Sequence, residues 1–248
     1  IASLTDMVHA GYTKKDIAGM TAREQLDALH ASTKEFMKNQ YQTLNRSLIP
    51  QLAQNGLKLV RHHEDLTPKQ AKYVDKYFEK DVYPVLTPMA VDSSRPFPLV
   101  RNKSLNIGAL IYDKKKDVTD IATVQVPSVL PRIVRLPSEE KGVTEIILLE
   151  EVIEKNLDKL FLNYDIVCAY PYRIMRNADF SIDEEETADL LKEIEKQLKQ
   201  RQWGEVIRLE VDEAMDKKLL KELKKHLGVD DEVVYKINGP LDLTFLMK

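Results

Sequence analysis

Three basic residues in a proline-rich stretch have the side-chain type and spacing that point most directly to binding chemistry. Arg95, Arg101 and Lys103 lie close together in the chain and could face a polyanion. Each proline fixes its own φ, so we expect a rigid and irregular backbone there. The prolines are Pro84, Pro88, Pro96 and Pro98, and the expected apolar anchors are Val85, Leu86, Phe97 and Leu99. We favour the simpler interpretation of this stretch as a structural hinge between a helical region and a mixed region.

Histidine and cysteine do not form a recognisable catalytic or metal-binding set. His62 and His63 precede two acidic residues, but adjacent side chains of an extended strand point to opposite faces, so a polar loop is favoured over a metal site. His30 is expected at the edge of a helical packing rather than as a general base. The single cysteine, Cys168, lies in an apolar run, which favours a buried, inert thiol and excludes an intramolecular disulfide.

The sequence also lacks the common catalytic motifs. It contains no G-x-G-x-x-G, no G-x-x-x-x-G-K-[ST], no H-E-x-x-H and no G-x-S-x-G, and only eight glycines are available to build a phosphate-binding loop. No pair of acidic residues has a spacing that separates an acid–base couple from ordinary surface charge. We therefore assign no catalytic, cofactor-binding or metal-binding residue from these patterns.

Composition and charge narrow the class of protein further. The 248 residues are 43% hydrophobic and 31% charged, which is enough apolar material for a sizeable core. The net charge of −3 divides into +3 over residues 1–80 and −6 over residues 81–248, so neither half has the concentrated basic surface of a duplex nucleic-acid binder. No apolar run approaches the ~18 residues of a transmembrane segment, and the first residues do not resemble a signal peptide. We expect a cytoplasmic protein.

The first 82 residues have the pattern of helices. Thr21 and Glu24 match a capping box, and apolar residues recur at helical spacing from there until Pro50, which is expected to stop the helix. These residues are Leu26, Leu29, Phe36, Met37, Tyr41, Leu44 and Leu48. A short extended segment at 57–60 follows, and Thr67 caps a second helix that reaches about residue 82. This pattern predicts a small helical bundle over residues 1–82.

Residues 83–248 alternate between strand and helix patterns. The expected strands are 105–112, 121–126, 132–136, 145–149, 164–175 and 206–211, and the expected helices are 150–160, 182–202 and 212–227. Gly228 follows the last helix in the position typical of a C-terminal cap. The predicted fold class is α+β, with the helical bundle followed by a middle domain in which helices pack on a mixed sheet.

The proline-rich stretch resembles the junction between the N-terminal and middle (head) domains of bacterial type 1 polyphosphate kinases. Further segments resemble the same family in the same order, so the likeness covers essentially the whole chain. These segments are His9–Tyr12, Ala18–Thr21, Gln40–Leu48, Val126–Ser128, Arg132–Pro137 and Arg176–Phe180.

The resemblance implies a parent enzyme that reversibly transfers the terminal phosphate of ATP to polyphosphate through a phosphohistidine, with magnesium. The catalytic histidines and phosphate-binding arginines of the family lie in two C-terminal domains, and this chain is expected to end before them. It is also expected to begin after a family segment with an asparagine that contacts the nucleotide. No catalytic or cofactor-binding residue is therefore carried over to this sequence, and the fragment alone is expected to be inactive.

Two functional interpretations follow. In the first, this region is a scaffold that forms tunnel wall and dimer contacts, and its partners are the remaining domains of a homo-oligomeric enzyme together with polyphosphate and ATP. In the second, it is a stand-alone polyanion-binding or protein-interaction module that uses Arg95, Arg101, Lys103 and the lysine-rich loop at 114–116. Affinity that falls steeply with salt favours the second interpretation, because exposed charges are screened.

Overall fold

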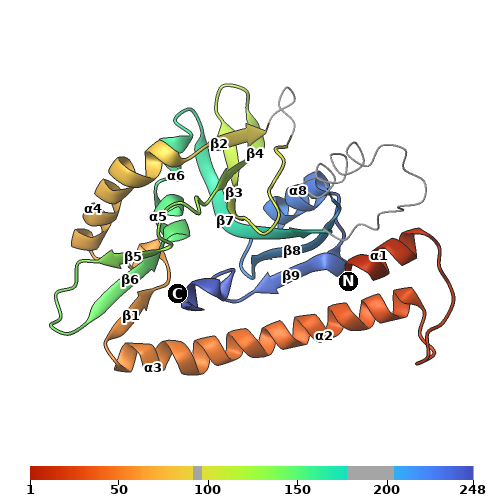
Figure 1. Cartoon of the computed structure of the whole chain (residues 1–248). Helices are drawn as coiled ribbons and strands as arrows, with labels where there is room; N and C mark the ends of the chain where they lie inside the picture. The colour runs from red at the N-terminus through yellow and green to blue at the C-terminus, as the bar shows by residue number, and fades with distance from the viewer. Residues whose placement is uncertain (92–96, 178–203, 248) are drawn as a thin grey trace, which may run out of the picture.

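A long helical segment runs along one side of the molecule. The computed structural model describes residues 1–91, 97–177 and 204–247. Helix α1 (Ala2–His9) leads to α2 (Ala22–Thr43), which continues through a π-helical turn at Leu44–Leu48 into α3 (Ile49–Gln54). Figure 1 shows α2 and α3 as one nearly continuous rod that passes beneath β9 (Val234–Ile237) and the C-terminal turn (Leu243–Met247).

The predicted start of the long helix is confirmed and its predicted stop is wrong. The hydroxyl of Thr21 accepts from the Glu24 amide at 3.3 Å, and the Glu24 carboxylate accepts from the Thr21 amide at 2.7 Å. Pro50 lies inside α3, after a turn in which the Ile49 amide bonds to the Leu44 carbonyl. A π turn is wider than an α turn, which gives the proline ring room against the preceding carbonyls.

A three-stranded sheet joins the two halves of the chain. Strand β1 (Leu57–Val60) pairs in parallel with β6 (Thr144–Leu148), and β6 pairs antiparallel with β5 (Ile133–Leu136). Beside this sheet lie α4 (Pro68–Tyr77) with its π-helical extension Phe78–Val82, then α5 (Leu149–Lys155) and α6 (Leu157–Leu160). Backbone pairing therefore crosses the expected division at residues 82–83.

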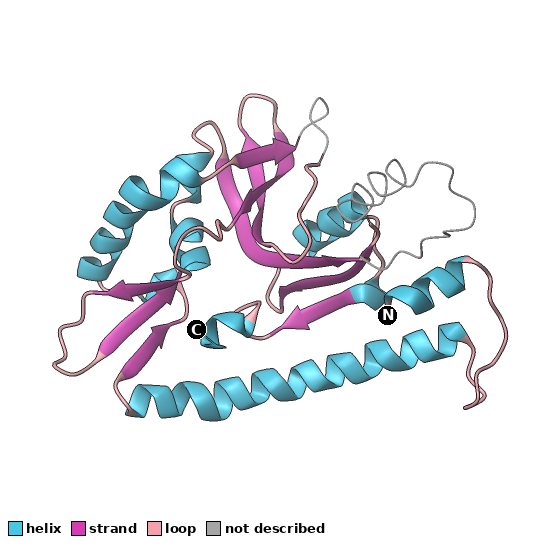
Figure 2. Ribbon diagram, in the orientation of Figure 1, coloured by secondary structure: helices cyan, strands magenta, loops and turns pink. Residues whose placement is uncertain are grey.

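A six-stranded sheet occupies the centre of the molecule, in the order β2-β4-β3-β7-β8-β9. The strands are β2 (Pro88–Val91), β3 (Leu105–Asp113), β4 (Val118–Gln125), β7 (Asp165–Arg176), β8 (Val206–Asp212) and β9 (Val234–Ile237). All neighbours are antiparallel except β8 and β9, which are parallel. Figure 2 shows the helices outside the strands, among them α8 (Lys217–Leu227). The predicted α+β class with mixed sheets is confirmed, although β2 and β9 were not anticipated.

Successive side chains of β3 point to opposite faces of the sheet and contribute to two separate apolar cores. Ile107, Ala109 and Ile111 contribute to a core shared with α2, α4, α5 and the three-stranded sheet. Leu110, which points to the opposite face, packs in a second core with Leu219 of α8. The sheet is thus covered on both faces.

Several sequence-based expectations need correction. Leu29, Phe36 and Leu48 are exposed, so the buried stripe of the long helix is narrower than its apolar spacing suggests. Val85 and Leu99 are also exposed and do not anchor the proline-rich stretch. The helix expected at 150–160 is interrupted at Asn156, and the last helix begins at Lys217 because the Asp216 carboxylate caps the amides of Lys218 and Leu219. The helix expected at 182–202 lies outside the described residues.

Arg132 connects three separate parts of this fold. Its guanidinium contacts the Glu150 carboxylate of α5 at 2.5 and 3.1 Å; Glu150 is buried and Arg132 is partly buried. The same group donates to the backbone carbonyls of Leu241 and Asp242 and lies 4.9 Å from the ring centre of Phe245. One side chain therefore holds β5, α5 and the C-terminal turn together.

We predict that Arg132→Met lowers the free energy of unfolding by about 3–5 kcal/mol, because it leaves the Glu150 carboxylate buried without a partner. Urea denaturation measures the loss. Arg135→Met, at an exposed position of the same strand, serves as the control. Arg132→Met combined with Glu150→Leu is expected to recover part of the loss, and a double variant as unstable as the single one contradicts this account.

Candidate functional site

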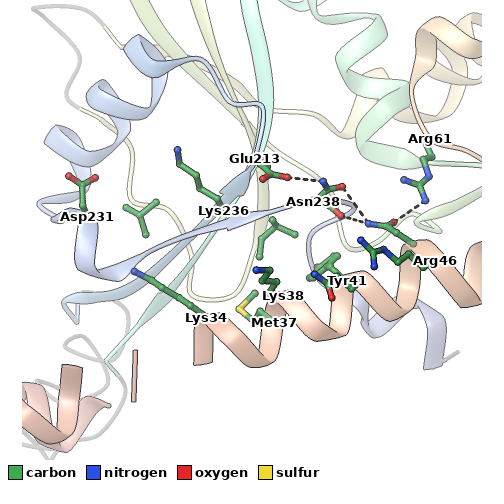
Figure 3. Close-up of a pocket in the computed structure, with 14 residues that line it drawn as sticks. Lys34, Met37, Lys38, Tyr41, Arg46, Arg61, Glu213, Asp231, Lys236 and Asn238 are labelled. Carbon is green, nitrogen blue, oxygen red and sulfur yellow. Dashed lines mark hydrogen bonds between the residues drawn. The ribbon is translucent and has the colours of Figure 1, made fainter. Parts of the chain in front are cut away.

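A groove of about 820 Å³ lies between the long helix and β9, and cationic side chains dominate it. We call it the basic groove. Its cations are Lys34, Lys38 and Arg46 from the long helical segment, Arg61 after β1, and Lys236 from β9. Figure 3 shows the lysines and Arg46 along the long helical segment and the adjoining strand, with Arg61 approaching from a separate segment. Two carboxylates, Glu213 and Asp231, are the acidic members of the lining.

Three of the groove's cations have no partner within the part of the chain that the structure describes. Lys38, Arg46 and Lys236 are exposed and make no hydrogen bond or ion pair there. Arg61 donates to the Asn45 side-chain oxygen at 2.9 Å, and the Lys34 ammonium lies 5.4 Å from the centre of the Tyr235 ring. Unpaired, solvated cations on two facing elements create a positive potential that attracts extended anions.

Hydrogen bonds hold the base of the groove in place. The Asn45 amide donates to the Asn238 carbonyl at 2.8 Å, and the Asn238 amide donates to the Glu213 carboxylate at 2.7 Å. Asp231 is engaged by Lys224 at 2.7 Å. Both acidic members of the lining therefore already have partners, which leaves the net character of the groove cationic.

Tyr41 and Gly239 fix the distance between the helix and the segment after β9. The Tyr41 hydroxyl donates to the Pro240 carbonyl at 2.8 Å, and burial raises the pKa of Tyr41, so the hydroxyl stays protonated as a donor. Gly239 has φ of +141°, and a Cβ there would lie 3.1 Å from the Tyr41 ring. Only glycine allows this close approach without strain.

His30 is a buried residue of α2, one helical turn before Lys34, and its role is structural. It is buried, and its Nδ1 lies 2.6 Å from the Tyr235 hydroxyl. Burial, and after it the charge of Lys34, lower the pKa of His30. The expectation that His30 serves packing rather than proton transfer agrees with this environment, although the ring lies inside the molecule rather than at an edge.

The structure brings together two of the three basic residues singled out from the sequence. Arg101 and Lys103 line a second cavity, of about 570 Å³, which also contains Arg132. Arg95 lies outside the described residues. The basic groove was missed because its cations come from segments about two hundred residues apart and because β9 was not anticipated. The available signal was the four-residue spacing of Lys34 and Lys38, which is equally typical of an ordinary solvated helix face.

Other sequence-based expectations concern single residues. Cys168 is a free thiol that is half-buried rather than fully buried, and burial raises its pKa. The Lys114–Lys116 run lies in the turn between β3 and β4, as expected. Among the described residues, no helix combines the length and the apolar character that a bilayer crossing requires.

The fold and the groove define an α+β protein with a surface suited to anions. Residues 1–60 match the family described as "Polyphosphate kinase N-terminal domain", and residues 69–248 match "Polyphosphate kinase middle domain". The chain therefore belongs to the polyphosphate kinase family.

Individual relatives agree with this assignment. The chain is 47% identical to the polyphosphate kinase of Lactiplantibacillus plantarum over its whole length, and 44% identical to that of Bacillus anthracis over 99% of its length. It spans only 34% and 36% of those proteins, so it corresponds to about a third of their length. The crystal structure of the Porphyromonas gingivalis polyphosphate kinase has the same fold, with a TM-score of 0.71 and 21% identity over 89% of this chain and 31% of that one.

We predict that His30 makes stability fall with acidity. The unfolded chain binds a proton at His30 near pH 6.5, whereas burial of the ring opposes protonation in the folded protein. The free energy of unfolding is therefore fully maintained above that pH and decreases as the pH falls below it. Lys34 opposes protonation of the ring, and Glu232 and Asp27 favour it. Urea midpoints between pH 7.5 and 5.5 are expected to fall less in His30→Gln than in the unsubstituted protein. Equal declines contradict the assigned effect of burial.

Proposed function

We propose that the protein to which this chain belongs reversibly transfers the terminal phosphate of ATP to polyphosphate, and that residues 1–248 hold and guide the phosphate chain. The observation that carries the proposal is the basic groove, in which Lys38, Arg46 and Lys236 lack partners among the described residues. A chain of linked phosphates has the length and the repeated charge to contact cations on both walls. Membership in the polyphosphate kinase family supports this choice of anion.

The chemical step is assigned to domains outside this chain. Phosphoryl transfer depends mainly on positioning and on stabilising charge, so a region that touches no reacting atom still influences the rate by holding the substrate. Within the proposal, this region also supplies wall for the active-site tunnel and contacts in a homo-oligomer.

ATP and magnesium are the cofactors that the family implies. The ammonium and guanidinium groups of the basic groove suit phosphate oxygens. Its two carboxylates, Glu213 and Asp231, already accept from Asn238 and Lys224, so the groove offers no free set of oxygen ligands for magnesium. We therefore propose that magnesium binds with the nucleotide in the catalytic domains.

A second candidate function is a stand-alone polyanion-binding module. The observation that favours it is the cavity shared by Arg101 and Lys103, which lies apart from the basic groove. The two candidates place the anion on different residues, so substitutions separate them.

We predict that removing three groove cations weakens binding of polyphosphate to this chain by about threefold to a hundredfold. Each exposed contact is worth roughly 0.2–1 kcal/mol, and about 1.4 kcal/mol corresponds to a factor of ten. Titration calorimetry with medium-length polyphosphate at two salt concentrations measures the effect. The groove variant is Lys38→Gln, Arg46→Gln and Lys236→Gln, the rival variant is Arg101→Gln and Lys103→Gln, and the control is Lys217→Gln, Lys221→Gln and Lys225→Gln on α8.

The outcomes of this titration separate the two candidates and include one that contradicts both. Loss only in the groove variant supports the proposed guiding role, and loss only in the rival variant supports the second cavity as the binding site. An equal loss in the α8 control shows that polyphosphate responds to total charge alone, which contradicts both candidates.

We further predict that this chain alone does not synthesise polyphosphate from ATP, whereas the parent protein does. In the parent, the groove variant is expected to raise KM for polyphosphate several-fold with kcat little changed, because the groove contributes binding rather than chemistry. Activity in the 248-residue chain contradicts the assignment of the chemical step. An unchanged KM contradicts the role of the groove.

A further inference from the structure

A second cluster of chemically capable side chains lies beyond Arg61, outside the basic groove. His63 comes from the short 3₁₀ turn His63–Asp65 after β1, and Glu151 and Glu154 lie one turn apart on α5. One donor atom from each of these three residues lies within 4.8 Å of the other two. His63 Nδ1 is 3.3 Å from Glu151 Oε2, and the backbone amide of His63 donates to the same oxygen at 2.9 Å.

Glu154 supplies an independent sign that something is missing from this cluster. Its Oε1 atom is fully buried and has no hydrogen-bond partner within the described part of the chain. An unpartnered carboxylate oxygen in such a place is costly unless a proton or a cation neutralises it. Burial, followed by the charges of Glu151 and Glu150, raises the pKa of Glu154, which agrees with a site that lacks positive charge.

Within residues 1–91, 97–177 and 204–247, the lysine and arginine side chains nearest the cluster are already paired elsewhere. Arg132 is committed to Glu150 and Lys155 to Asp75, in contacts of 2.5 and 2.6 Å. Asp212 and Glu64 add further negative charge toward Glu154. The cluster therefore combines excess negative charge, a nitrogen donor and an orphaned carboxylate oxygen.

We propose that His63, Glu151 and Glu154 form a binding site for a divalent transition-metal ion, with Zn²⁺ and Mn²⁺ as the best-matched ions. An imidazole together with two carboxylates suits these ions, whereas Mg²⁺ and Ca²⁺ prefer ligand sets made only of oxygen. Ligands in a tetrahedral zinc site lie about 3.4 Å apart, close to the observed separation of His63 and Glu151. Remaining positions are left for water.

The site has a structural consequence that the proposed phosphate-guiding role does not require. His63 lies between the residues matched by the two family descriptions, 1–60 and 69–248, and Glu151 and Glu154 belong to the second. A bound ion therefore clamps the turn after β1 onto α5. The clamp stabilises the folded state by mass action, since the unfolded chain does not hold the three ligands together.

The test uses the metal-stripped 248-residue chain, without ATP or polyphosphate because both chelate metals. Titration with ZnCl₂, MnCl₂ and MgCl₂ is followed by calorimetry and by thermal unfolding. We expect one tight site for Zn²⁺ or Mn²⁺, weaker binding of Mg²⁺, and a rise in Tm of about 5–10 °C at a hundredfold excess over Kd. Electron paramagnetic resonance of bound Mn²⁺ reports the site directly.

Substitutions locate the ion. Glu154→Gln keeps the side-chain shape and is expected to abolish both the binding and the Tm rise, and Glu151→Gln is a second variant should the first fold poorly. His62→Gln and Glu64→Gln, which alter the exposed neighbours of Glu151, are expected to retain binding. Glu222→Gln is the matched control, because Glu222 and His226 form an ordinary carboxylate–histidine pair on α8 at 3.9 Å.

Three results overturn the proposal. The first is the absence of saturable Zn²⁺ or Mn²⁺ binding to the unsubstituted chain. The second is an unchanged affinity in Glu154→Gln, and the third is an equal loss of binding in Glu222→Gln. None of these results bears on the groove, so this proposal and the proposed function fail independently.

Discussion

The buried pairing of Arg132 with Glu150 is the constraint on which the rest of the structure depends. Glu150 lies in the first turn of α5, so its position helps to set the direction in which Glu151 and Glu154 project. The remaining donors of the same guanidinium hold the carbonyls of Leu241 and Asp242, which directly follow the Gly239–Pro240 segment that packs on Tyr41. A charge that is expensive to bury thus connects the segment that packs on Tyr41, beside the basic groove, with the helix that carries Glu151 and Glu154.

The basic groove and the carboxylate cluster have opposite charge, and a smaller cavity is lined by residues of the groove and by Glu151 of the cluster. Arg61, Glu213 and Asn238 line the basic groove and also a smaller cavity, of about 280 Å³, that contains His62 and Glu151. The chain changes from cationic to anionic surroundings between Arg61 and His63. Under the two proposals, a divalent ion bound by the cluster would offset negative charge beside the basic groove, so the potential in the groove would depend on both sites.

Features determined by neighbouring residues could be predicted from the sequence, and features determined by distant ones could not. The capping box at Thr21, the left-handed glycine at Gly228 and the long apolar run of β3 depend on local chemistry, and all three are confirmed. Pro50 misled the prediction because the compensating π turn has no clear sequence signal. Strand β9 is only four residues long and contains Lys236, so its pattern is weak.

The candidate sites show the same limit. Arg101 and Lys103 could be named because they are close in sequence, whereas Lys236 joins Lys38 and Arg46 only through the packing of β9 on the long helix. His63 could not be grouped with Glu151 and Glu154 from the sequence, because they lie about ninety residues away in the chain. The spacing of these residues in the sequence does not show that either set of side chains comes together in the fold.

The parallel pairing of β1 with β6 has a consequence for how the protein is made. Strand β1 ends at Val60, but its partner β6 is complete only when Leu148 has been synthesised. The buried side of α2 is covered later still, when β9 has been synthesised. At roughly 5–20 residues per second, β1 leaves the ribosome roughly 5–20 s before β6 exists. Throughout this interval the amphipathic helix and an unpaired strand are exposed together on a nascent chain. The helical segment that precedes β1 is therefore fixed in place only after these later strands emerge, and it needs protection from aggregation until β9 has been synthesised.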